Sequence, residues 1–104
     1  GTLKSDPPTQ AAALKLSKDD TVNTHQKLRT FDRIREAVLP EYRDRVAEYL
    51  SLYEEALHDD NIQSDDLRAS ANQLRGYLRG LNTTRVLGMA DWEELDRRVV
   101  ESWL

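Results

Sequence analysis

Residues 65–81, DDLRASANQLRGYLRGL, carry apolar side chains at nearly every third or fourth position. The apolar members are Leu67, Ala71, Leu74, Leu78 and Leu81. Because an α-helix has about 3.6 residues per turn, this spacing gathers them on one face. The stretch therefore predicts an amphipathic helix with a buried stripe. Ser64 is a suitable N-cap residue, and Asp65 and Asp66 suit the positive end of a helix dipole.

Three more stretches have the same period, and no useful run alternates as a β-strand would. Helices are expected over 21–38, over 40–58 with Pro40 in its first turn, and from about Asp91, where Asp91–Glu94 resembles a capping box. Their apolar stripes are Val22, Leu28, Phe31, Ile34 and Val38; then Tyr42, Val46, Tyr49, Leu50, Tyr53 and Leu57; then Trp92, Leu95, Val99 and Trp103. We therefore predict an all-α fold, a three- or four-helix bundle with short loops over 21–104.

The first twenty residues lack a sustained apolar period and include Pro7 and Pro8. We expect residues 1–20 to form a flexible N-terminal tail. The chain starts at Gly1, and Met89 is its only methionine. We therefore expect this start to be a processed end or a cloning remnant, and the chain to be either a whole protein or a domain cut from a longer one.

Composition limits the remaining classes of protein. The chain has 104 residues, of which 38% are hydrophobic and 33% charged, and it has no cysteine. This length fits one domain, and the missing thiols exclude disulfides and thiolate zinc sites. A reducing compartment fits best, so we expect a cytoplasmic location. No apolar run approaches the roughly 20 residues that a membrane span needs.

The net charge of −4 conceals a strong segregation along the chain. Residues 21–35 and 67–90 are basic, whereas 36–66 and 91–104 are acidic. The simplest interpretation is that the first and third helices pack beside the second and fourth, with opposite charges helping to select the topology.

No pattern of catalytic or metal-binding residues emerges. Glu55 and His58 have the Glu-x-x-His spacing of di-iron bundles, but a helical wheel points both away from the apolar stripe. The loop that begins at Asp59 has serine, at Ser64 and Ser70, where a calcium-binding EF-hand needs glycine and glutamate. We therefore expect no enzyme, metal or cofactor.

The polar side of the 65–81 helix is unusual. Arginines form a stripe beside the apolar face, and the back of the helix is uncharged and built largely from small residues that include Gly76 and Gly80. Each glycine inside a helix costs about 1 kcal/mol relative to alanine, which suggests that something approaches the backbone closely. Either another helix of the same bundle packs there, or an external partner does.

The external alternative leads to the functional hypothesis. We expect a non-catalytic protein-interaction or assembly module that binds another protein or a second copy of itself. The alternative is a nucleic-acid-binding module that uses the arginine stripe, which the acidic overall charge makes less attractive. The expected partner-binding residues are Arg68, Asn72, Arg75, Gly76, Arg79, Gly80, Arg85 and Trp103.

Overall fold

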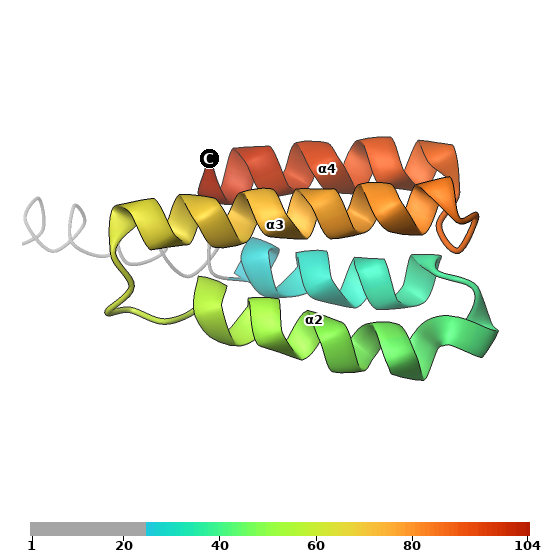
Figure 1. The fold of residues 1–104 in the computed structure, drawn as a ribbon, viewed down its shortest axis with the longest axis horizontal. Coiled ribbons are helices and arrows are strands. Elements are labelled where there is room, and N and C mark those ends of the chain that lie inside the picture. Colours follow the sequence, from blue (N-terminus) through green and yellow to red (C-terminus); the bar gives the residue numbers. More distant parts are fainter. Residues whose placement is uncertain (1–24) are drawn as a thin grey trace, which may run out of the picture.

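The computed structural model describes residues 25–104, which form a four-helix bundle without a β-strand (Figure 1). The elements are a helix over 25–37, the short 3₁₀ helix η1 (Pro40–Tyr42), α2 (Arg43–Leu57), α3 (Ser64–Thr83) and α4 (Met89–Trp103). The predicted all-α bundle with short loops is confirmed. The predicted tail over 1–20 and the start of the first helix lie outside the described residues.

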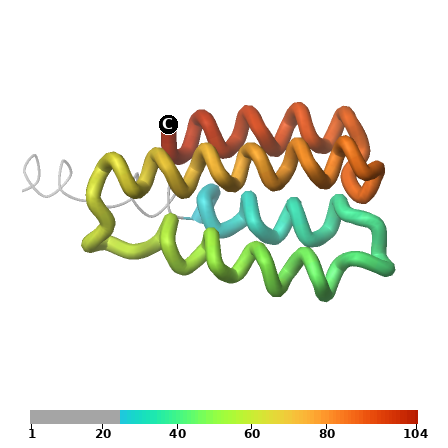
Figure 2. Tube along the Cα trace, viewed as in Figure 1, coloured from blue at the N-terminus to red at the C-terminus, as the bar shows by residue number. Residues whose placement is uncertain are grey.

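Short connections make successive helices run in opposite directions (Figure 2). Residues 58–63 join α2 to α3, and residues 84–88 join α3 to α4. Pro40 starts η1 because its fixed φ suits the first turn of a helix. At the same end of the bundle, the Leu39 amide donates a hydrogen bond of 3.0 Å to the Val86 carbonyl. The two turns at this end are thereby connected.

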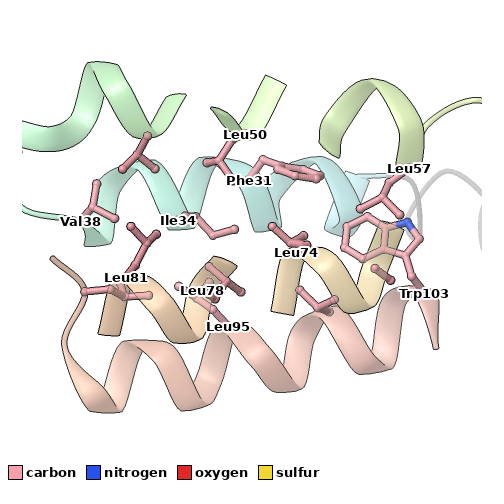
Figure 3. Packing of buried hydrophobic residues seen from close by; sticks show 14 residues of the cluster. Phe31, Ile34, Val38, Leu50, Leu57, Leu74, Leu78, Leu81, Leu95 and Trp103 are labelled. Atoms are coloured by element: carbon pink, nitrogen blue, oxygen red, sulfur yellow. The ribbon is translucent and has the colours of Figure 1, made fainter. Parts of the chain in front are cut away.

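The core runs along the inside of all four helices (Figure 3). Its buried members are Phe31, Ile34, Val38, Val46, Leu50, Leu57, Ala71, Leu74, Leu78, Leu81, Leu87, Leu95, Val99 and Trp103. The sequence period predicted nearly all of them. Leu87 was missed because it lies in a turn, where no helical period applies.

One end of the core is aromatic. The Trp103 ring lies 5.7 Å from that of Phe31 and 6.2 Å from that of His58 (centroid distances). Trp103 is only 6% exposed, so its assignment to a partner-binding surface was wrong. It is buried because α4 continues to this residue, which places Trp103 on the same face as Leu95 and Val99.

The wheel analysis also misplaced three side chains of the 40–58 segment. Tyr42 and Tyr49 are 46% and 47% exposed, because Val46 and Leu50 set the centre of the buried stripe and the tyrosines lie at its edges. His58 was expected to face solvent. It caps α2 outside the regular helix, so its ring turns inward onto Phe31.

Both predicted N-caps were wrong. Ser64 is the first residue of α3 and Gln63 is its N-cap, whereas α4 starts at Met89 after the N-cap Gly88. Neither N-cap makes a side-chain hydrogen bond. Apolar periodicity locates a helix well but determines its ends poorly.

Three ion pairs join neighbouring helices, and each one links a basic helix to an acidic one. Arg33 pairs with Glu94 on α4, Arg35 with Glu54 on α2, and Arg75 of α3 with Asp96 of α4. The predicted packing of basic beside acidic helices is therefore borne out among the described residues. No helix in this part of the chain is both long and apolar enough to cross a membrane.

The position of His58 makes stability depend on pH. Burial lowers the pKa of His58 below its ordinary value of 6.5; Glu54 partly opposes this shift and Lys27 adds to it. The folded state therefore takes up this proton less readily than the unfolded chain. We predict that the free energy of unfolding is retained above pH 6.5 and falls as the pH drops below it.

Urea unfolding at about pH 7.5 and about pH 5.5 measures this fall. In His58→Gln the fall should be smaller than in the unmodified chain. An equal fall in both proteins would mean that His58 does not contribute to it.

Candidate functional site

The buried stripe of α3 determines which residues this helix presents outward. Ala71, Leu74, Leu78 and Leu81 face the core, so Gly76 and Gly80 lie on the opposite, exposed side. A Cβ atom added at either glycine would have no atom of residues 25–104 within 4 Å, apart from its chain neighbours and the local helix backbone. Among the described residues 25–104, no other helix packs against the glycines, so the explanation that one does is wrong for this part of the chain. Within it the outward face of α3 is open.

A hollow of about 310 Å³ lies beside this face, between α3 and α4. Four of the predicted residues line it together with two from α4. The lining residues are Asn72, Arg75, Gly76, Arg79, Trp92 and Asp96. The sequence did not indicate the two α4 residues, because their proximity to α3 depends on how the helices pack.

Arg75 is partly exposed, but its guanidinium is engaged by another residue of the fold. Its guanidinium donates to both carboxylate oxygens of Asp96, with Nε–Oδ1 at 2.8 Å and Nη2–Oδ2 at 3.2 Å. The hydrogen bond to Asp96 raises the pKa of Arg75 above its ordinary value. A further contact of 3.4 Å joins Arg75 Nη1 to Asn72 Oδ1. Arg75 therefore holds α3 to α4 and is a poor candidate for binding a partner.

Arg68 and Arg79 differ from Arg75 in this respect. Both are exposed on α3, and neither forms an ion pair with a residue in 25–104. They lie on the same side of the helix, eleven residues or about 16 Å apart. Their guanidinium groups can reach an external carboxylate or phosphate without breaking a bond within this part of the fold.

Arg85 occupies an unusual backbone position just after α3. Its φ of 66° lies in the left-handed region, where glycine is strongly favoured. The Val86 amide bonds to the Leu81 carbonyl at 2.9 Å, and the Arg85 amide bonds to the Asn82 carbonyl at 3.0 Å. These two bonds form a Schellman motif, which ends the helix. The exposed Arg85 therefore occupies a position whose backbone conformation glycine would adopt with less strain.

A second exposed surface lies on the other side of the glycines, where α3 meets α2. The Tyr77 ring of α3 packs between two tyrosines of α2, with centroids 5.9 Å from Tyr49 and 6.0 Å from Tyr53. Beside them Leu52 is 64% exposed. The sequence analysis missed this surface because it placed Tyr49 in the core and gave Leu52 no role.

The sequence offered two patterns to compare with metal sites, the Glu-x-x-His pair and the loop that begins at Asp59. Within 25–104 no group of three or more histidine, aspartate or glutamate side chains could hold a metal ion. Glu55 is exposed and His58 turns inward, so the Glu-x-x-His pair does not converge on one site. The features that stand out are surfaces.

Comparisons of the chain with protein-family models, curated proteins and solved structures gave no match. The function is therefore inferred from the geometry of the chain itself.

Gly76, Gly80 and Arg85 are each expected to lower the free energy of unfolding, and substitution tests this expectation. We predict that Gly76→Ala and Gly80→Ala each raise the free energy of unfolding by about 1 kcal/mol, because the new methyl meets open space and alanine favours the helix. Arg85→Gly should raise it by about 1 kcal/mol, because glycine adopts a positive φ without strain.

Thermal unfolding measures these changes, with about 4–8 °C expected per kcal/mol in a domain of this size. A lower melting temperature in either glycine variant would contradict the open face of α3.

Proposed function

We propose that this domain is a non-catalytic protein-interaction module that works through the outward face of α3. The observation that carries the proposal is the open space over Gly76 and Gly80. Glycine lowers helix stability, and nothing within the described fold compensates for it there. A partner whose atoms approach the α3 backbone would provide that compensation.

The surroundings of the glycines support this proposal. Tyrosine and arginine are the residue types most enriched where protein interfaces gain their binding energy. Tyr49 and Tyr77 border the glycines on the α2 side, and Arg79 borders them on the α4 side. An apolar centre with a charged edge is the usual organisation of an interface.

Site-specific photo-cross-linking tests the proposal directly. A benzophenone amino acid replaces Gln73, which is exposed on α3 one turn before Gly76. After illumination in cells that express the chain natively, we expect discrete protein adducts heavier than the 12.0 kDa chain. The same amino acid at Arg97, exposed on α4, is the matched control and should give none of these adducts. Identical adduct patterns at both positions, or no adduct at Gln73, would overturn the proposal.

Nucleic acid is the second candidate partner, and the observation that favours it is the pair of unengaged arginines. Arg68 and Arg79 project from one side of α3, and Arg85 follows at the end of the helix. Such a row can follow a phosphate backbone even on a protein with a net charge of −4.

Fluorescence anisotropy with a labelled DNA duplex and a labelled RNA tests this second function. If it holds, binding at about 50 mM salt should weaken steeply by about 200 mM salt, because neutralised phosphates release counterions. Arg68→Ala/Arg79→Ala should abolish the signal. Arg45→Ala/Arg97→Ala removes two exposed arginines elsewhere and should preserve it. The absence of binding at low salt would exclude a role for these arginines in holding nucleic acid.

A further inference from the structure

We propose that the partner of the α2–α3 surface is a second copy of this chain, arranged as a symmetric dimer in which α3 of each copy lies on α2 of the other. The inference rests on the proposed function and specifies its partner. Three observations carry it. They are the positions of residues on α2 and α3 along the helix axes (their heights), the exposed apolar side chains, and the complementary charges.

The tyrosine contacts give the relative heights of the two helices. Tyr77 lies between Tyr49 and Tyr53, and its ring is about equally far from both. Because α2 and α3 are antiparallel neighbours, one residue forward on α3 corresponds to one residue back on α2 (Figure 1). Gly76 is therefore level with Leu52, and Gly80 is level with Glu48.

Two-fold symmetry turns these heights into a prediction of contacts. A rotation axis parallel to the helices, placed over the α2–α3 surface, exchanges the two helices and leaves every height unchanged. Each residue of α3 then faces the residue of α2 at its own height in the second copy. The geometry places the exposed Leu52 of one copy over Gly76 of the other. The large apolar side chain of Leu52 would lie where Gly76 has no side chain. Because the interface is symmetric, it would contain this contact twice.

The edges of this surface carry opposite charges. Arg79 and Arg68 lie along the outer edge of α3, and Glu48 and Glu55 lie along the outer edge of α2. None of these four side chains forms an ion pair with another residue in 25–104. In the dimer Arg79 lies within one residue of the height of Glu48 of the second copy. Arg68 similarly lies near Asp59 of the second copy, at the end of α2.

The size of the surface fits a weak dimer. The 20 residues of α3 span about 30 Å, and two adjacent helices are about 20 Å wide. The contact would cover about 600 Å² per copy, slightly below the roughly 800 Å² of a standard interface. We therefore expect dissociation in the micromolar range.

Sedimentation equilibrium of the full chain from about 1 µM to about 300 µM provides the first test. The mass should rise with concentration from 12.0 kDa toward twice that value. Leu52→Glu should weaken the dimer at least tenfold, because it introduces a carboxylate into the apolar centre. Met89→Glu is the matched control, because Met89 is 62% exposed on α4 and Leu52 is 64% exposed on α2. It should leave the dimer unchanged.

A charge exchange tests the arrangement itself. Arg79→Glu and Glu48→Arg should each weaken self-association, because each creates two repulsive contacts across the interface. An equimolar mixture of the two variants should associate at least as tightly as the unmodified chain, because both contacts in the mixed dimer are again attractive. A dimer with α3 on α3 would not show this rescue.

The outcomes separate this inference from the proposed function. A chain that stays monomeric at every concentration overturns the dimer, and so does a dimer that Leu52→Glu leaves intact or that mixing fails to rescue. In each case, adducts to other proteins at Gln73 would still support an interaction module. Adducts at twice the chain mass would agree with the dimer.

Discussion

The burial of one stripe of α3 is the constraint on which the rest of the surface depends. Ala71, Leu74 and Leu78 have no measurable exposure, and together they fix the rotation of the helix about its axis. Once they face inward, the 3.6-residue period leaves no choice about what faces outward. Gly76 and Gly80 must point away from the core, and Arg75 must lie toward α4. The open surface is therefore a geometric consequence of the core.

The helical period of the apolar residues predicted the structure well wherever packing in the core determines it. It predicted the helices and most of the buried residues, since an amphipathic helix shows its buried face in its sequence. It was less reliable at the margins of that face. Tyr49 falls within the angular range of the apolar stripe but remains half-exposed, because a large side chain at the edge of a stripe extends across the surface.

Local structure outside regular helices could not be predicted in the same way. His58 follows α2 with φ of −105°, so extending the helical wheel to this residue gives the wrong direction. Trp103 was misjudged because its burial depends on Phe31 and His58, which lie against its ring in the fold but far from it in the sequence. The site was predicted in part. The arginines, the glycines and Asn72 of the candidate site followed from sequence, but Leu52 on α2 and Tyr77 on α3 required knowledge of which helices are neighbours.

Charge segregation has two roles in this molecule. Arg35, Arg33 and Arg75 bind acidic residues on neighbouring helices, so they belong to the bundle itself. Partly exposed pairs of this kind contribute at most about 1 kcal/mol each. In an alternative packing, helices of like charge would be neighbours, and their repulsion would oppose that packing. The basic residues left over on α3 and the acidic ones left over on α2 form separate edges of one surface. Opposite charges that are not paired within a copy are free to attract each other across a symmetric contact between copies, which supports the proposed dimer.

The two proposed partners would compete for the same arginines. In the dimer, Arg79 and Arg68 face carboxylates of the second copy, whereas on nucleic acid they would face phosphates. Because one guanidinium cannot neutralise both groups fully, dimer formation would weaken phosphate binding along α3. Arg85 differs because it follows the end of α3, in the turn whose Val86 carbonyl accepts a hydrogen bond from the Leu39 amide, and this turn lies away from the Leu52–Gly76 contact. Because Arg85 lies outside the proposed contact, its positive charge would stay available at that end of α3 in the monomer and in the dimer alike.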